Sequence, residues 1–230
     1  MNKLAKIIAE ILLLLAAVLL VVLIVRSIQE PVQFNKEKAA REQVAIQRLK
    51  DLRDLEVAYK SANGRFSDNI DTLKAFYEEG NLEVVLQIGS QDDSIAVART
   101  AELKKQNKKL TNEDLYELYK KGESHLVFSI STKVPVKDTL FKNRTNFSVD
   151  SLGVIPFSGG EKVQIESIVK KVSGVDVPLF EARVPYKALL KGLDNQLRIN
   201  LDAERENQNR YVGLQVGSIS APNNNAGNWE

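Results

Sequence analysis

The residues of this chain that could do chemistry are few, and the most conspicuous is a glutamate inside an apolar segment. The chain has one histidine, His125, and no cysteine, so a thiolate site is impossible and we expect no histidine-based metal site. Glu10 is the only charged residue between Ile7 and Val25. An ionisable side chain in such a segment is costly and suggests a partner. Two interpretations stay open: Glu10 reaches water at a membrane surface with the help of Lys6, or it contacts a neighbouring subunit inside the membrane.

The sequence patterns of common enzymes are not found. His125 does not lie beside a G-x-S-x-G turn, and the alternating segment around it predicts a side chain on the face of a sheet. Gly159-Gly160 lacks the G-x-x-x-x-G-K-[ST] context of a phosphate-binding loop, so a hairpin turn is expected there. The paired acids Asp92-Asp93 lie next to a predicted turn, where solvation explains them. We therefore expect a protein that is not an enzyme, with no catalytic, cofactor-binding or metal-binding residues.

The apolar segment Ile7–Val25 has the length and composition of a transmembrane helix. As a helix it rises about 28 Å, which is close to the thickness of the hydrocarbon core of a bilayer. Only a helix satisfies its own backbone groups in lipid. A secretory signal peptide would have a shorter apolar core and then a small-residue cleavage site, and Arg26-Ser27-Ile28 is not such a site. We therefore expect an uncleaved anchor.

The positive charges on the two sides of the apolar segment nearly balance. The orientation is therefore predicted from the lengths of chain before and after the segment. Lys3 and Lys6 precede the segment, and Arg26 and Lys36 follow it. Because a very short tail precedes the helix and a large domain follows it, we predict a single pass through the inner membrane. The tail 1–6 would lie in the cytoplasm and the C-terminal domain in the periplasm. The lipid bilayer is then the first expected partner.

A second helical pattern follows the transmembrane helix 7–25. Pro31 is expected to break or kink the chain just beyond the bilayer. An amphipathic stalk helix is predicted over 32–63, ended by Asn63-Gly64. Its apolar residues recur every three or four positions, and this stripe could pack on the chain's own domain or on another copy. The residues expected to form the packing stripe are Leu49, Leu52, Leu55 and Tyr59.

The rest of the chain predicts an α+β fold, in which a mostly antiparallel sheet is combined with short helices. We expect this extracytoplasmic domain to cover 64–220 and a polar tail to cover 221–230. Because Ile95–Leu110 is polar and rich in lysine, it predicts a mobile excursion. The predicted helices are Ile70–Glu79, Glu113–Lys121 after a capping box at Thr111–Asp114, and Leu193–Glu206, where a strand is also permitted. The predicted strands are Leu82–Ile88, His125–Val136, Phe147–Phe157, Lys162–Val169, Asp176–Leu190 and Tyr211–Ile219. The stretch Asp176–Leu190 is either one strand or a pair broken at Pro185.

The balance of charges excludes one class of partner. Lys and Arg number 32 and Asp and Glu 30, and the two signs are closely mixed, giving a net charge of +2. A nucleic-acid-binding protein needs a basic face, so we expect no nucleic-acid partner. Without cysteine, an extracytoplasmic domain must fold without disulfides.

The first third of the chain resembles the type IV pilins and pseudopilins. A short leader, an apolar helix with one glutamate near its start and an amphipathic continuation are followed by LRDLEVAYKSANGRFSDNIDTLKAF, from Leu52 to Phe76. The resemblance implies that the helices bundle and that Glu10 meets a neighbouring subunit's N-terminal amine after the leader is removed. The sequence departs from that family at the cleavage site, because the usual Gly-Phe pair is absent. A cut between Ala5 and Lys6 would place Glu10 fifth.

Nearly the whole chain resembles a family of single-pass envelope proteins of Bacteroidetes. The stretches that carry the resemblance are EPVQFNKEKAAREQ, KVPVKDTLF, VPLFEARVPYKALLKGLD and GLQVGSISAPNNNAGNWE. The resemblance implies a location in the envelope and no particular activity. Four tripeptides look like the O-glycosylation sequon of that phylum, and their acceptor residues would be Thr72, Ser94, Thr139 and Ser151.

These observations lead to three hypotheses of different classes. The first is a non-enzymatic, membrane-anchored structural or assembly component of a bacterial envelope complex, similar to a pseudopilin, whose partners are other envelope proteins or further copies of itself. The second is an accessory subunit of a membrane motor or transport complex, with Glu10 as the coupling charge. The third is a tethered enzyme or carbohydrate binder, which would need a pocket of convergent carboxylates and aromatic rings.

Overall fold

A computed structural model describes residues 3–145 and 147–230, without the side chains of residues 3–6, 8 and 9. Its first element is a single helix, α1 (Lys3–Asn63), which continues through Pro31. Of the break or kink expected at Pro31, the break does not occur. Proline removes one intrahelical hydrogen bond, but the good helix formers Gln29, Glu30 and Gln33 surround it, and the helix does not end there.

Beyond α1 the chain is α+β, as predicted, and it divides into two compact units. The first unit comprises the described residues up to Asp54, together with Phe66–Ile70 and Ser148–Glu230. The second comprises Leu55–Arg65 and Asp71–Phe147. The region 64–220, predicted as one domain, thus contributes to both units.

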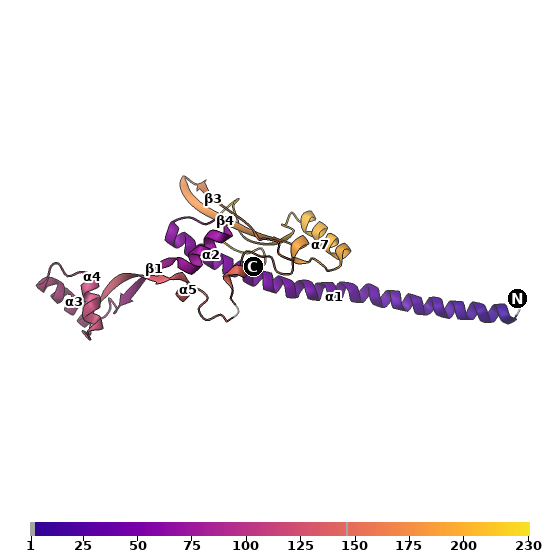
Figure 1. Cartoon of the computed structure of the whole chain (residues 1–230), viewed down its shortest axis with the longest axis horizontal. Helices are drawn as coiled ribbons and strands as arrows, with labels where there is room; N and C mark the ends of the chain where they lie inside the picture. Colours follow the sequence, from indigo (N-terminus) through magenta and orange to yellow (C-terminus); the bar gives the residue numbers. More distant parts are fainter. Residues whose placement is uncertain (1–2, 146) are drawn as a thin grey trace. The chain divides into compact units, whose positions relative to one another are not determined.

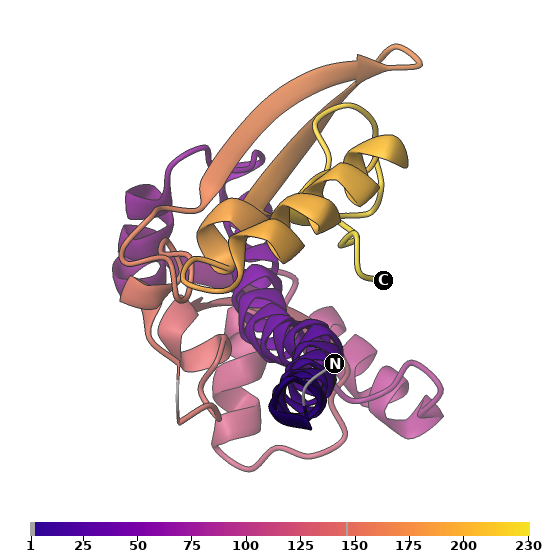
Figure 2. The same cartoon turned by 90° about the vertical axis from the view of Figure 1, so that its right-hand side faces the viewer.

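The first unit contains a three-stranded antiparallel sheet in the order β3-β4-β5. Its strands are β3 (Gln164–Val172), β4 (Val175–Pro185) and β5 (Gly213–Gly217). Figures 1 and 2 show the long hairpin of β3 and β4. Ser173 and Gly174 join β3 to β4, and both have positive φ, as a tight two-residue hairpin requires. The hairpin turn predicted at Gly159-Gly160 is instead part of the loop between Val154 and Lys162, which form an isolated antiparallel bridge.

Short helices complete the first unit. They are the 3₁₀ turn η1 (Val149–Ser151), α6 (Tyr186–Leu189) and α7 (Asn195–Asn207). The strand predicted over Phe147–Phe157 is wrong, because turns and η1 occupy that stretch. The helix predicted at Leu193–Glu206 is confirmed as α7, whose N-cap Asp194 accepts a hydrogen bond from the backbone N–H of Leu197.

The core of the first unit brings the sheet and α1 together. Phe180, Ala182 and Val184 of β4 are buried, as are Ala45 and Leu49 of α1. The ring of Phe180 also lies 4.7 Å from that of Phe66, centroid to centroid. The C-terminal segment 221–230 returns to this unit, since Gly227 bridges Val216 on the far edge of β5. The predicted polar tail is therefore packed.

The second unit is built on a two-stranded antiparallel ribbon of β1 (Asn81–Ile88) and β2 (Phe128–Pro135). Helix α2 (Ile70–Glu79) precedes β1, as predicted, and α5 (Val136–Thr139) follows β2. Between the strands lie α3 (Ser94–Gln106) and α4 (Asn112–Lys120). A small core of Leu115, Leu126 and Phe128 joins α4 to the ribbon.

Two sequence predictions in the second unit are wrong. The stretch Ile95–Leu110 is no mobile excursion, because most of it is α3, capped by Asp93, with Ala96 and Thr100 buried. His125 does not lie on a sheet face, since β2 begins only at Phe128 and His125 is in a bend with a φ of 57°. The capping box at α4 is confirmed: Thr111 and Asp114 exchange their side-chain-to-backbone hydrogen bonds.

Candidate functional site

The N-terminal part of α1 exposes a long apolar surface. Its large apolar side chains from Ile11 to Val25 are between 44% and 74% exposed, and none of its most apolar stretch is buried. By length and composition this helix can cross a membrane, which is consistent with a single-pass membrane protein. Glu10 is exposed at the start of this surface. The side chain of Lys6, proposed as its neighbour, lies outside the described residues.

The later part of α1 is fixed to the rest of the first unit by arginines. Arg41 donates to the carbonyl oxygens of Leu189, at 3.1 Å, and Lys191, at 2.8 Å. These carbonyls lie at the end of α6, where helical partners are lacking. Arg48 donates to the carbonyls of Ser151, at 3.2 Å, and Val154, at 2.7 Å.

Arg53 adds a third link one and a half turns further along α1. Its Nη1 lies 2.7 Å from Oε1 of Glu230. The hydrogen bond from Arg53 holds the pKa of the Glu230 carboxyl below its ordinary value. For Arg48, burial lowers the pKa of the guanidinium. Together Arg41, Arg48 and Arg53 form what we call the arginine seam.

A buried phenol lies beside the arginine seam. Tyr186, the first residue of α6, is fully buried, and its hydroxyl donates to Oε1 of Glu42 at 2.5 Å. The hydroxyl oxygen of Tyr186 in turn accepts a hydrogen bond from Nη2 of Arg205 in α7 at 2.8 Å. Glu42 also pairs with Lys38 at 3.1 Å. Burial, followed by the nearby Glu42 carboxylate, raises the pKa of Tyr186, so the phenol stays protonated and serves as a structural donor.

The predicted packing stripe is buried within the chain. Leu49, Leu52 and Leu55 are each no more than 1% exposed. Tyr59 is half-buried, and its ring meets that of Phe76 edge-on, with centroids 5.2 Å apart. The stripe was expected to pack either on the chain's own domain or on another copy. These three leucines are buried by the chain itself, so almost none of their surface is open to another copy.

The four residues of the glycosylation-like tripeptides are not equally accessible. Thr72 in α2 and Ser94 at the start of α3 are exposed. Thr139 is exposed too and donates to the carbonyl of Pro135 at 3.2 Å. Ser151 is half-buried in η1, where its hydroxyl donates to the carbonyl of Ser148 at 2.7 Å. The four residues belong to four different elements, α2, α3, α5 and η1.

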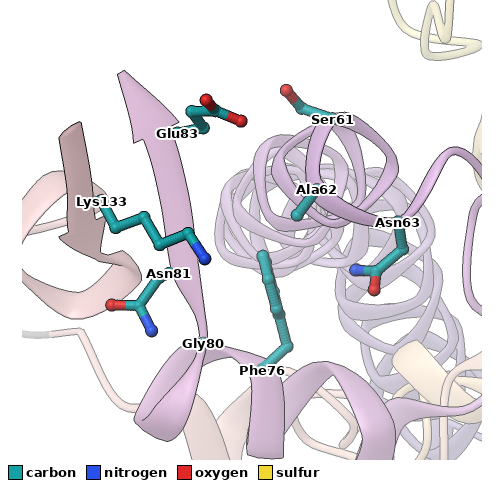
Figure 3. A pocket seen from close by; sticks show the side chains of 8 residues that line it. All are labelled: Ser61, Ala62, Asn63, Phe76, Gly80, Asn81, Glu83 and Lys133. Atoms are coloured by element: carbon teal, nitrogen blue, oxygen red, sulfur yellow. The ribbon is translucent and has the colours of Figure 1, made fainter. Parts of the chain in front are cut away.

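The second unit has a polar hollow of about 440 Å³ beside the end of α1 (Figure 3). The ring of Phe76 stands between that helix end and β1. Glu83 and Lys133, which are cross-strand partners, line one wall, and Asn63 lies on the other side. Gly80 admits the ring, because a Cβ there would lie 2.5 Å from Cδ2 of Phe76. These groups can hydrogen-bond a polar ligand, but Glu83 is the single carboxylate in the described lining, unlike the carboxylate pair of glycosidases.

A second hollow, of about 480 Å³, lies in the first unit where α1 meets the loop before α7. Phe34 and Leu193 supply apolar lining, and Glu30, Glu37 and Asp194 supply carboxylates. Across the described part of the chain, no three His, Cys, Asp or Glu side chains are grouped closely enough to hold a metal ion.

The arginine seam and the Tyr186 network were missed by sequence reasoning. A signal for the seam was present, since Arg41 and Arg48 are seven residues apart, on the same side of the helix and next to the apolar stripe. Their acceptors are backbone carbonyls more than a hundred positions away, which leave no mark in the sequence. Comparison with protein-family models, curated proteins and solved structures finds no significant match for this chain.

Proposed function

We propose that this protein is a non-enzymatic assembly component of a bacterial envelope complex, anchored by one pass of α1 through the inner membrane. In this proposal the N-terminus faces the cytoplasm and both folded units lie in the periplasm. The observation that carries it is the continuity of α1, from an exposed apolar surface to a stripe buried in the fold. The resemblance to pseudopilins adds lateral packing of the apolar surface against further copies or other envelope proteins.

The contacts along α1 support a role in positioning rather than in catalysis. Arg41 and Arg48 bind two separate segments, the end of α6 and the loop around η1, and Tyr186 ties α1 to α7 through Glu42 and Arg205. These links fix the rotation of α1 about its own axis relative to the first unit. The face that the apolar surface presents in the membrane is then set by the folded unit.

Cysteine crosslinking in native membranes tests the lateral packing. The chain has no cysteine, so single cysteines at Leu12 or Val18 report only on their own positions. We expect one of them to give a disulfide-linked dimer or a crosslink to another membrane protein. A cysteine at Thr132, which is exposed on β2, is the matched control and should stay uncrosslinked. Monomers at both membrane positions would remove the assembly part of the proposal.

The orientation is tested separately with a membrane-impermeant maleimide. A cysteine at Glu204, exposed on α7, should be labelled in spheroplasts without lysis. A cysteine at Asn2 should need lysis. The reverse pattern would overturn the periplasmic placement, and extraction of the protein by alkaline carbonate would overturn the anchor itself.

Glu10 favours a second candidate, an accessory subunit of a membrane motor or transport complex. An exposed carboxylate on an apolar membrane helix is costly and can carry a coupling charge. Glu10→Gln removes the charge at constant size. If the variant is inserted and recovered with the same neighbouring proteins as the wild type, with transport unchanged, Glu10 has no coupling role.

A further inference from the structure

We infer that the outer edge of β1, with the polar hollow beside it, binds an extended segment of a partner polypeptide, which adds to the ribbon as a third strand. The inference rests on the proposed assembly role and names the kind of partner that this role requires. Among the described residues, β1 pairs with β2 and with no other strand, so its second edge is open to hydrogen bonding. A two-stranded ribbon is only marginally stable in water, and a third strand stabilises it.

The hydrogen bonds of the ribbon show which backbone groups of β1 face outward. The N–H of Val136 donates to the carbonyl oxygen of Gly80 at 3.0 Å, one step beyond the first pair of the ribbon. Because hydrogen-bonded and non-hydrogen-bonded pairs alternate in an antiparallel ladder, every second residue of β1 points its N–H and C=O away from β2. These residues are Asn81, Glu83, Val85 and Gln87. The carbonyl of Ser129, which lies opposite Gln87, has the same phase, since it accepts from the side chain of Asn112.

The edge of β1 lacks the features that keep other edge strands from pairing. Natural edge strands carry lysine or proline, or are covered by another segment. The strand β2 has Lys133 and Pro135 at outward-facing positions, β3 carries two adjacent lysines, and the edge of β5 is covered by the bridge to Gly227. The strand β1 has no lysine and no proline, and its residues 83–87 are all exposed. This edge is therefore the one best suited to accept a further strand.

The two faces of an added strand would meet different surroundings, both within the second unit. On one face of β1 lie Val84 and Leu86, which are each 38% exposed and would be covered by apolar side chains of the partner. On the other face Glu83 lines the polar hollow of about 440 Å³, with Asn63 at the end of α1 on its other side (Figure 3). Successive side chains of a strand point to opposite faces, so a segment of alternating apolar and polar residues fits both.

The charge at the hollow selects a basic residue in the partner. Glu83 is exposed, and the carbonyl end of α1 beside the hollow adds negative potential. Lys133 lies on the far side of Glu83, one strand spacing further from the partner. Opposite charges on directly opposed residues stabilise a strand pair, so we expect a lysine or arginine of the partner to face Glu83.

A second copy of β1 does not supply that basic residue. Residues that are directly opposed in a sheet lie on the same face, so the second copy could place only its own outward-facing set opposite Glu83. That set is Asn81, Glu83, Val85 and Gln87, and none of the four is basic. The occupant is therefore a segment of a different sequence.

Fluorescence anisotropy of a labelled peptide with the full-length protein in detergent tests strand addition. The probe is fluorescein-labelled TVKVTVT, in which valines alternate with polar residues and one of these is lysine. Main-chain bonds supply most of the affinity in strand addition, so such a generic sequence is sufficient. We expect saturable binding with a dissociation constant below about 1 mM.

Two proline variants separate the two edges of the ribbon. Val85→Pro removes an outward N–H and leaves the bonds to β2 in place, so it should weaken binding at least about tenfold. Ser131→Pro is the matched control, because Ser131 is the direct partner of Val85 and faces outward on the edge of β2. It should bind the peptide as the wild type does.

A change of charge gives a second readout that keeps the backbone of β1 intact. Wild-type protein should bind TVEVTVT about two- to fivefold more weakly than TVKVTVT. The double variant Glu83→Lys, Lys133→Glu keeps opposite charges across the ribbon, since these residues are direct partners, and it should reverse this order.

Three results would each overturn the inference: no saturable binding up to about 1 mM, equal weakening by the two proline variants, or an unchanged peptide preference in the double variant. A dimer of the wild type that Val85→Pro abolishes would show that a second copy occupies the edge, and would also overturn it. None of these results bears on the anchor or on the lateral packing of α1, which crosslinking and carbonate extraction test separately.

Discussion

The hydroxyl of Tyr186 lies 2.5 Å from a carboxylate oxygen of Glu42, across 144 positions of sequence. This contact joins the helix that carries the apolar surface to the fully buried start of α6. Arg205 completes the network from α7. The side chains of Glu42, Tyr186 and Arg205 thus link α1, α6 and α7 through polar contacts.

Replacing Tyr186 with phenylalanine should destabilise the first unit by about 1–3 kcal/mol, because Glu42 and Arg205 each lose a partner in a half-buried place. The measurement is urea unfolding of the full-length protein in detergent, followed by the fluorescence of Trp229, the single tryptophan. Tyr119→Phe removes a hydroxyl from an exposed ring and should leave the unfolding midpoint unchanged. Equal midpoints for Tyr186→Phe and wild type would mean that the network contributes nothing to stability.

Replacing Arg48 with alanine should loosen the loop that contains η1. The carbonyl of Val154 would lose its Arg48 donor, and the carbonyl of Ser151 would keep only the backbone N–H of Val154. A carbonyl left without a donor away from water costs about 1–3 kcal/mol. Hydrogen exchange should rise at residues 149–155 and stay the same in α4. Arg210→Ala, which removes an exposed arginine from the loop before β5, is the matched control. Equal hydrogen-exchange rates at residues 149–155 in Arg48→Ala and Arg210→Ala would contradict a specific role for Arg48.

Leu52 and Val57 offer a matched pair on α1. Leu52 is 1% exposed and Val57 46% exposed. Leu52→Ala should lower the free energy of unfolding by about 2–5 kcal/mol, whereas Val57→Ala should change it by less than about 0.5 kcal/mol. The comparison uses the same urea titration. Similar losses in both variants would contradict a specific contribution from the buried stripe, because alanine raises the helical propensity at both positions.

The contact between Arg53 and Glu230 predicts a dependence on pH. Because the hydrogen bond from Arg53 lowers the folded-state pKa of Glu230, the contact stabilises the C-terminal segment above the unfolded pKa. That stability is lost as the pH falls through the folded pKa, which lies below the ordinary value of a glutamate. We expect the fluorescence of Trp229, in the same segment, to change over this range. In Glu230→Gln the change should vanish, and a transition that persists in that variant would have to come from another carboxyl.

Local signals account for the parts of the fold that sequence predicts well. The capping box of Thr111 and Asp114 predicts the start of α4, and Gly80 predicts the end of α2. The largely apolar stretch Leu82–Ile88 predicts β1 almost to the residue. Each of these signals acts within one turn or one strand, where the sequence alone determines the preferred conformation.

Long-range packing accounts for what the sequence does not predict. The polar composition of α3 conceals a helix, because only Ala96 and Thr100 are buried and Thr100 is held through the backbone N–H of Val127. Pro31 is expected to break or kink the chain, yet α1 continues through it. The arginine seam depends on carbonyls that any residue type can provide, so its acceptors cannot be recognised before the chain is folded.

Because α1 is uninterrupted, it fixes the angle between its exposed apolar surface and the folded unit. Each residue added between Arg26 and Phe34 would turn that apolar surface by about 100° and move the folded unit by about 1.5 Å along the helix axis. Seven added residues make nearly two full turns, so the apolar surface would face almost its original direction while the folded unit lies further along the helix axis. The number of residues in this short stretch therefore sets both the height and the rotation of the folded unit relative to the apolar surface. The effect of a deletion there should depend on the rotation it causes, and not only on how many residues are removed.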